Sequence, residues 1–201
     1  DKSQSSLRFL MRLDHELKFA RAEIHGAVQY GLAGFLAAQY PNGGWHQHFR
    51  DKIAPSQPAD LKASFPESWS RLHAWTGFSR YYTINDSTLR DLIRTMLLAH
   101  EIYWEQRFFD AAKRGCDFLI LAQMPAPHPA WAQQYNFAMQ PVWARIFEPP
   151  AVSGGESQAV MAMLIDLALA TGDARYLEPV PRALDYLRAT HLTDGRLARF
   201  Y

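Results

Sequence analysis

The sequence predicts an all-α protein in which paired helices form an α/α toroid, with long irregular loops on one face. Three observations support this fold class. Six stretches carry apolar residues at a helical spacing. A motif that follows the second stretch recurs after the fourth. The connections after these two stretches are long and rich in Pro, Gly and aromatic residues, which forbids a continuous helix through them.

The six predicted helices have recognisable ends. Asp86 or Ser87 is placed to cap the third helix, and Gly172 is placed to end the fifth. Pro179 and Pro181 lie in the first turns of the sixth, where a missing N–H group costs little. The helices are expected at residues 5–18, 22–39, 87–103, 108–123, 156–171 and 176–190.

The segment between the second and third helices, residues 49–82, shows no sustained period. Its aromatic residues predict a packed excursion, not a linker. They are Trp69, Trp75, Phe78, Tyr81 and Tyr82.

The internal repeat suggests how the helices are arranged. Two helix ends share a Phe-Leu…Gln…Pro pattern, and each is followed by a Trp-x-Gln-x-aromatic run. A weaker third copy, at residues 185–187, is followed by 197–201. Three helix pairs that return through loops at one end would gather those loops on one face, where a ligand would bind. The strong copies are Phe35–Pro41 with Trp45–Phe49, and Phe118–Pro125 with Trp131–Tyr135.

The loop at residues 133–156 is the most informative part of the chain. A connection longer than about twelve residues is usually functional or disordered, and one this rich in aromatic residues favours an ordered cleft wall. Arg145 lies between Trp143 and Phe147, and Arg is the side chain best suited to hold a carboxylate with two parallel hydrogen bonds. A salt bridge to Glu148 or Glu156 that pins the loop is an equally good interpretation.

Other polar and aromatic residues offer a second set of candidates. Asp86 is either a helix cap or an oxygen ligand for a hard cation, and the two roles are compatible. The Trp-x-Gln runs suit saccharide binding, since aromatic faces pack on sugar rings and amides bond hydroxyls, although core packing of the Trp is as good an explanation. The saccharide-binding candidates are Trp45, Gln47, Trp131 and Gln134.

The composition argues against several classes of function. Lys and Arg number 21 against 20 Asp and Glu, so no overall charge favours nucleic acid or a membrane surface. The single cysteine, Cys116, excludes an internal disulfide, and we expect it to be buried in a helix. Neither a long apolar span nor a signal-peptide pattern occurs. We expect a single domain over residues 1–201, a fragment that begins without Met and ends inside a motif.

Signatures of other enzyme classes are missing. The histidines form no His-Glu-x-x-His pattern, the paired glycines lack the following Lys of a phosphate-binding loop, and no Gly-x-Ser-x-Gly elbow occurs. A glycosidase that uses two carboxylates among Asp86, Glu148 and Glu156 stays open.

Several segments, taken together, resemble polysaccharide lyase family 10 pectate lyases. The resemblance covers nearly the whole chain, and its motifs occur in order. They are Gln39-Tyr-Pro-Asn-Gly-Gly-Trp45, Tyr82-Thr-Ile-Asn-Asp86, Trp131-Ala-Gln-Gln-Tyr135, Pro141-Val-Trp-Ala-Arg-Ile-Phe-Glu-Pro-Pro150, Ser153-Gly-Gly-Glu-Ser157 and Gly195-Arg-Leu-Ala-Arg-Phe-Tyr201.

The resemblance implies an (α/α)3 toroid that cleaves polygalacturonate by β-elimination with Ca²⁺ as cofactor. It implies that Arg145 is the catalytic base, Asp86 a calcium ligand and Arg199 a substrate-binding residue. It also implies a secreted or periplasmic protein, which we expect to be a monomer. The family's other calcium ligands lie in a stretch before the first helix, where this chain has only Asp1-Lys-Ser-Gln-Ser.

Two other functions stay open beside the lyase. One is a non-catalytic or truncated pectin-binding domain that keeps the cleft without the full calcium site. The other is an α/α-barrel glycoside hydrolase that uses a carboxylate pair.

Overall fold

A computed structural model of the chain describes residues 2–48, 56–73 and 77–201. Phe49 and Trp75, which belong to predicted aromatic runs, and Asp1 lie outside the described residues. Six α-helices run along the described chain. They are α1 (Lys2–Glu16), α2 (Ala22–Ala38), α3 (Thr88–Tyr103), α4 (Gln106–Leu121), α5 (Gly154–Thr171) and α6 (Pro179–Ala189).

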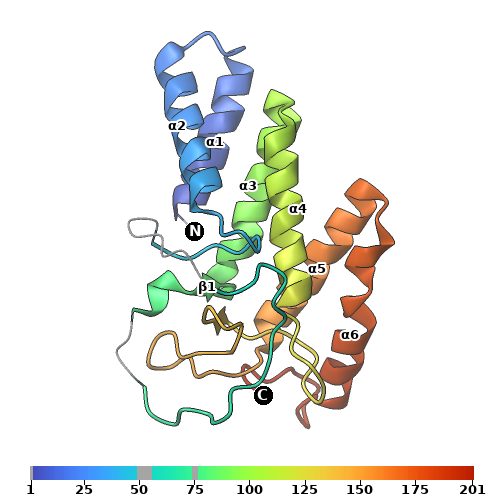
Figure 1. Ribbon diagram of the computed structural model, residues 1–201. Helices are drawn as coiled ribbons and strands as arrows, with labels where there is room; N and C mark the ends of the chain where they lie inside the picture. Colours follow the sequence, from blue (N-terminus) through green and yellow to red (C-terminus); the bar gives the residue numbers. More distant parts are fainter. Residues whose placement is uncertain (1, 49–55, 74–76) are drawn as a thin grey trace.

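The helices are arranged as three antiparallel pairs, as the repeat predicts (Figure 1). Within each pair, a short connection joins the helices at one end of the molecule, and the long loops and the C-terminus gather at the other end (Figure 1). α1 packs on α2 and α3, α3 packs most extensively on α4, and α5 packs on both α4 and α6. The prediction of an α/α toroid with its loops on one face is confirmed.

In two of the pairs, a residue in the left-handed conformation ends the first helix. Trp104 ends α3 in the left-handed conformation, with its N–H donating to the His100 carbonyl at 2.8 Å, and α4 begins two residues later. Gly172, at φ +70°, ends α5 as predicted, because glycine adopts this conformation without a steric penalty. A 3-10 turn, η3 (Ala174–Leu177), precedes α6. The sixth helix therefore begins at Pro179, later than the predicted residue 176.

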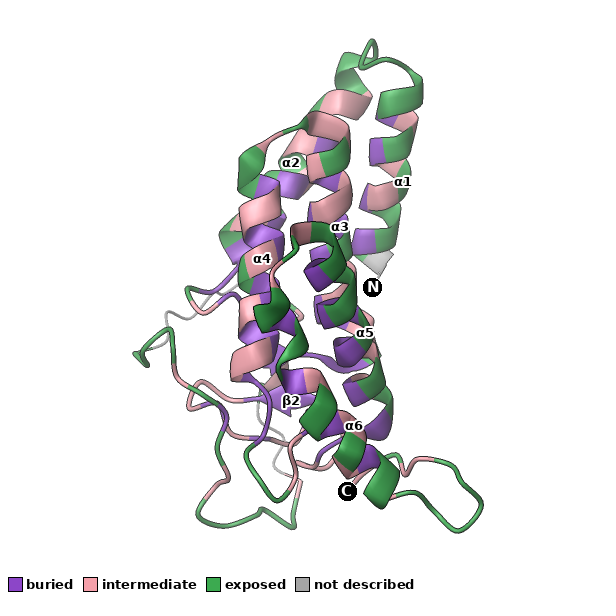
Figure 2. Ribbon diagram, turned by 90° about the vertical axis from the view of Figure 1, so that its right-hand side faces the viewer, coloured by how far each residue is buried: buried purple, intermediate pink, exposed green. Residues whose placement is uncertain are grey.

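The core lies between the helix pairs and continues under the loops. Buried residues line the helix sides that face one another, while exposed residues occupy the outer sides and the short turns (Figure 2). Cys116 is buried in α4, as predicted. The largest fully buried side chains include Trp45, Trp131, Tyr82 and Tyr135, and all four come from the loop end. Burial of each contributes on the order of 2–3 kcal/mol or more, so the loops are part of the core.

A small strand pair, absent from the sequence prediction, joins the two long loops. β1 (Tyr82–Thr83) pairs antiparallel with β2 (Gln134–Tyr135), with Tyr82 opposite Tyr135. Two-residue strands are too short to show the alternating pattern by which strands are recognised. Two further 3-10 turns flank β1, and they are η1 (Phe78–Arg80) and η2 (Asn85–Ser87). The pairing sets the residues after β1 beside those after β2.

Candidate active site

Backbone hydrogen bonds that join the two long loops determine where the candidate side chains lie. The Gln133 carbonyl accepts hydrogen bonds from the N–H groups of both Ile84 and Asn85, at 2.9 and 3.1 Å. The Val142 N–H donates to the Gln134 carbonyl at 3.1 Å, which turns the chain back after β2. Asp86 follows β1 by three residues, and the returning chain carries Arg145. The two predicted site residues therefore meet because of the β1–β2 pair.

Arg145 is the centre of the candidate site. Its Nη2 donates to Asp86 Oδ2 at 2.8 Å, its Nε donates to Glu148 Oε2 at 2.7 Å, and Nη2 also bonds Glu148 Oε1. The backbone N–H of Arg145 donates to Glu148 Oε2 as well, at 3.1 Å. The salt bridge to Glu148 that the sequence left open is formed. Although this salt bridge is formed, 40% of the Arg145 side chain remains accessible to solvent.

Glu148 is the buried anchor of this arrangement. Its side chain is 1% exposed and is bonded by Arg145 and by Nδ2 of Asn85, at 3.3 Å for the amide. Burial alone would raise the pKa of the Glu148 carboxyl, but the bonds from the Arg145 side chain and backbone, with that from Asn85, outweigh it and hold the pKa below its ordinary value. Glu148 therefore stays ionised and keeps Arg145 in place.

The same contacts determine the charge of Arg145. Its hydrogen bond to Glu148 raises the pKa of the guanidinium, more than burial lowers it, and the charge of Asp86 adds to the increase. Arg145 is thus a cation before any ligand binds. A positive group that is partly exposed and held by a buried carboxylate is suited to meet a carboxylate of a substrate.

Asp86 lies in η2 in the left-handed conformation, at φ 51°, and the next residue, Ser87, is also left-handed at φ 61°. The predicted cap is not formed: the Ser87 side chain makes no capping bond to α3, and the Asp86 carboxylate bonds Arg145. A capping residue normally has an extended backbone conformation, and both Asp86 and Ser87 are left-handed. Half of the Asp86 side chain, 51%, is exposed beside Arg145.

Arg199 reaches the same place from the C-terminal segment. An isolated bridge pairs Phe200 with Ser153, and the Tyr201 N–H donates to the Val152 carbonyl at 2.9 Å. Nη2 of Arg199 lies 4.0 Å from Glu148 Oε1, with its side chain 61% exposed. The guanidinium carbons of Arg145 and Arg199 lie 4.9 and 5.7 Å from the centre of the Phe147 ring. The structure therefore brings Arg145, Asp86 and Arg199 together around Glu148.

The model of the Pec_lyase family, described as pectic acid lyase, matches residues 5–200. The chain belongs to the pectic acid lyase family. A search of the curated proteins found no sequence significantly similar to this chain.

Two solved structures are similar to this member of the pectic acid lyase family. One is a mutant of a family 10 polysaccharide lyase from Cellvibrio cellulosa in complex with trigalacturonic acid, at a TM-score of 0.67 and 19% identity, covering 94% of this chain and 53% of that one. The other is the family 10 polysaccharide lyase from the same organism, at a TM-score of 0.63 and 19% identity, covering 93% and 51%. The chain spans about half the length of these structures, and at this identity they establish its fold.

Three of the predicted saccharide-binding residues of the pectic acid lyase chain are in the interior, and for the two Trp residues the core-packing alternative applies. Trp45 and Trp131 are fully buried, and their indole N–H groups donate to the carbonyls of Phe35 at 2.9 Å and Leu119 at 2.7 Å. A sugar ring has no access to a face that protein atoms cover. Their role is to tie the start of each long loop to the end of the helix before it.

Gln134 is the third of these corrections. It is 1% exposed, and its amide donates to the Phe78 carbonyl and to Thr83 Oγ1, both at 2.9 Å. The N–H groups of this amide therefore bond β1 and the turn η1 before it. Gln47, by contrast, is half-buried and stays a candidate contact for substrate.

Two residues of the candidate site were missed in the sequence. Phe147 lies under both guanidinium groups, and Asn85 bonds the anchor Glu148. The available signal for each was its closeness in sequence to a predicted site residue, since Phe147 is two residues from Arg145 and Asn85 precedes Asp86. Neither residue type indicates such a role without its partners.

The described residues do not form a calcium site by themselves. Among them, no three His, Cys, Asp or Glu side chains lie close enough to hold a metal ion. Asp86 offers an exposed carboxylate, while Glu148 is buried under Arg145, and Glu156 accepts bonds from Gln133 at 3.0 Å and from Ser153. Calcium takes about six to eight oxygen ligands. The ligand set in these ranges is therefore incomplete for that ion.

Proposed function

We propose that this chain is the catalytic domain of a pectate lyase, which cleaves polygalacturonate by calcium-dependent β-elimination into 4,5-unsaturated oligogalacturonides. One observation carries the proposal. Arg145 and Asp86 are 2.8 Å apart on an exposed loop surface, with Arg199 beside them. Two guanidinium groups and a carboxylate in one place suit a polymer that carries one carboxylate on each sugar unit.

The chemistry requires a base and a means of holding negative charge. The C5 hydrogen of galacturonate is α to a carboxylate, and its removal places charge on that carboxylate. The C4–C5 double bond then forms as the C4–O bond to the next unit breaks, and the leaving oxygen takes a proton from water. The neutral form of the Arg145 guanidine is proposed as the base that takes the C5 proton, and Arg199 and Gln47 as groups that hold substrate. Positive groups aimed at the carboxylate favour the charged intermediate.

Calcium is proposed as the cofactor, with Asp86 as its ligand in this chain. The ion would supply positive charge at the substrate carboxylate. Because the described residues provide an incomplete ligand set, the other oxygen ligands in the proposal come from substrate and water. Pectin is a polymer of the plant cell wall, so the protein is proposed to act outside the cell or in the periplasm, as a monomer.

A direct test uses the absorbance of the new C4–C5 double bond. The chain is incubated with polygalacturonate and calcium, and ultraviolet absorbance is compared with the release of reducing ends. The proposal expects both to rise together. Reducing ends without absorbance would indicate hydrolysis, the alternative that uses a carboxylate pair.

Variants sharpen this test. Arg145→Ala should lower the rate at least a thousandfold, on the order of what loss of a base and of one charge-stabilising donor costs together. Arg196→Ala is the matched control, because that side chain is 79% exposed and paired with Asp194. Equal rates for wild type and Arg145→Ala would remove Arg145 from the mechanism. Binding of pectate without turnover in the wild type would favour the non-catalytic pectin-binding domain.

A further inference from the structure

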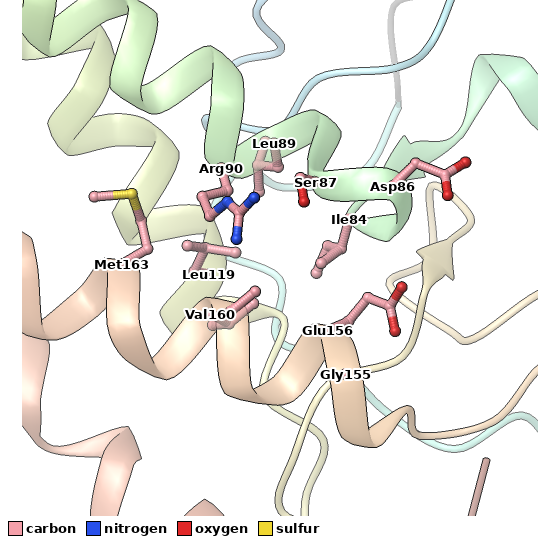
Figure 3. Close-up of a pocket in the computed structure, with 11 residues that line it drawn as sticks. Ile84, Asp86, Ser87, Leu89, Arg90, Leu119, Gly155, Glu156, Val160 and Met163 are labelled. Atoms are coloured by element: carbon pink, nitrogen blue, oxygen red, sulfur yellow. The ribbon is translucent and has the colours of Figure 1, made fainter. Parts of the chain in front are cut away.

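A cavity opens between the N-terminal turns of α3 and α5, with Asp86 and Glu156 at its edge (Figure 3). Its volume is about 220 Å³, smaller than the ~300–1,000 Å³ of pockets that hold drug-sized ligands. Leu119, Val160 and Met163 give it an apolar floor. It has room for one group about the size of a sugar, with an apolar side.

The cavity is open because α5 presents small residues to it. Gly155 and Ala159 line it on the first turns of the helix. A Cβ atom at Gly155 would meet no heavy atom within 4 Å, so the space above this residue is free. Substitution at Gly155 can therefore fill the mouth of the cavity without a clash.

Arg90 provides the cation of this cavity. Its side chain bends from α3 into the space between α3 and α5 (Figure 3). Within the described part of the chain, its buried Nε has no hydrogen-bond partner, and its only ion contact is at 3.8 Å, to Asp91. Asp91 also lies 3.6 Å from Arg8. One-third of the Arg90 side chain is exposed, so the group remains accessible to a ligand.

The next arginine along α3 has an ion-pair partner on α5. Arg94, one turn further, faces α5 in the same way and lies 3.5 Å from Asp166. At the level of Arg90, the residues of α5 that line the cavity are Gly155, Glu156, Ala159, Val160 and Met163. Within the described ranges, Arg94 pairs with an acid of α5, whereas Glu156, the acid of α5 at the edge of the cavity, forms no ion pair with Arg90.

The carboxylates at the edge of the cavity already have partners. Asp86 is paired with Arg145 at 2.8 Å, and Glu156 accepts from Gln133 at 3.0 Å and from Ser153. The first turns of α3 and α5 add the partial positive charge of two helix N-termini. An anion in the cavity would therefore have Arg90 as its partner, on the side away from Asp86 and Glu156 (Figure 3).

We propose that this cavity, the Arg90 pocket, binds one carboxylate-bearing sugar unit. Arg90 holds the carboxylate, and the apolar floor packs against a C–H face of the ring. The choice of galacturonate as that sugar rests on the proposed function, because the pocket shares Asp86 with the Arg145 site. The sugar is either one unit of the polymer or a free uronate, and both offer the same chemistry.

The test measures binding to the whole chain by calorimetry in a chelating buffer, so that no bond is cleaved. Galacturonate, its methyl ester and trigalacturonate are titrated into wild type, Arg90→Gln and Arg94→Gln. Arg90→Gln should weaken binding about tenfold to a hundredfold, the range for a hydrogen bond to a charged group. Arg94→Gln should bind as wild type does, and the methyl ester should bind weakly to all three. An effect on trigalacturonate identifies a polymer unit, and an effect on the monomer alone identifies a free uronate.

A second variant guards against a fold defect. Gly155→Leu should fill the pocket and weaken binding by a similar factor, with a melting temperature close to that of wild type. Equal affinities of wild type, Arg90→Gln and Gly155→Leu would overturn the inference. If those affinities are equal while unsaturated products still form, the lyase proposal stands alone. If Arg90→Gln weakens binding but the wild type forms no such product, the pocket stands and the lyase proposal falls.

Discussion

At the scale of single residues, the candidate site depends on one buried carboxylate. The Glu148 carboxylate accepts hydrogen bonds from the side chain and the backbone N–H of Arg145. It also lies 4.0 Å from Nη2 of Arg199. A buried charge without a partner is costly, so the site is stable only when Arg145 remains near Glu148. This coupling affects both the basicity of Arg145 and the stability of the loop.

The first prediction concerns the dependence of turnover on pH. Glu148 raises the pKa of Arg145, so only a small fraction of the guanidine is neutral at pH 7. If Arg145 is the base, kcat/KM should rise with pH into the alkaline range, close to tenfold per unit. Glu148→Gln should move this rise to lower pH, because it removes the contact that raises the pKa. A profile that is flat above about pH 6 would point to a carboxylate base instead.

The second prediction concerns acid stability. The pKa of Glu148 is lower in the folded chain than its ordinary value of 4.5. The resulting stabilisation is fully present above about pH 4.5 and is lost as pH falls through the folded pKa. Urea unfolding of Glu148→Gln should therefore show a deficit of about 1–3 kcal/mol near neutral pH, and a smaller one below pH 3. A deficit that is the same at every pH would show that the charge of Glu148 contributes nothing.

At the scale of elements, the internal repeat is reproduced in three dimensions. The Gln39 amide donates to the carbonyls of Gly43 and Ala111, and its oxygen accepts from Arg114 of α4. Gln123 donates to the carbonyls of Pro129 and Pro179, and its oxygen accepts from Arg182 of α6. Each Gln ends one pair and is bonded by an Arg of the next. The repeated Gln is therefore a structural link between neighbouring helix pairs.

The third prediction tests this link. Replacing Gln39 or Gln123 with Ala should lower the free energy of unfolding by about 1–3 kcal/mol, because buried partners lose their bonds. Gln158→Ala is the control, since that exposed side chain makes one local bond to the Gly154 carbonyl and should cost no more than about 0.5 kcal/mol. Equal losses for all three variants, measured by urea unfolding, would contradict the role of the link.

Close helix packing supplies the fourth prediction. A Cβ atom at Gly115 of α4 would lie 2.7 Å from Ile93 Cγ1 and 2.9 Å from Trp45 Cζ3. Gly115→Ala should thus destabilise the chain by about 1–3 kcal/mol through overpacking, despite the higher helix propensity of Ala. Gly34→Ala in α2, where a Cβ meets nothing within 4 Å, is the matched control. It should be neutral or stabilising in the same thermal melt, and a stabilising Gly115→Ala would contradict the packing argument.

At the scale of the whole molecule, the toroid collects residues that are far apart in the sequence. Asp86 precedes α3, Arg145 precedes α5, and Arg199 follows α6, yet all three lie around Glu148. Every pair returns its chain to the same end (Figure 1), and there the contacts of Arg145 and Arg199 bring these three residues together. The helix pairs thus position these charged groups next to one another at the loop end.

The fifth prediction separates catalysis from folding at this scale. Chelation of calcium should abolish the ultraviolet-absorbing product, and added calcium should restore it. The melting temperature should change little, because within the described ranges no cluster of acidic or His side chains could hold a structural ion. Undiminished product formation in chelator would remove calcium from the proposal.

Sequence reasoning captured the regular parts of this protein. The helices lie within a few residues of their predicted positions, because their apolar spacing and their end signals are local. The motifs of the pectate lyases also identified Arg145, Asp86 and Arg199 as one set. Their meeting is what the resemblance led us to expect, and their individual roles stay proposals.

Only the tertiary structure decided what the aromatic and amide residues do. Trp45, Trp131 and Gln134 have the side chains of a sugar-binding surface, but their environment is the interior, where they bond backbone groups. A side chain's chemistry is local, whereas its burial depends on segments distant in the chain. For the same reason the sequence could not distinguish Arg90 from Arg94: only the fold places Arg90 beside a cavity and Arg94 beside Asp166.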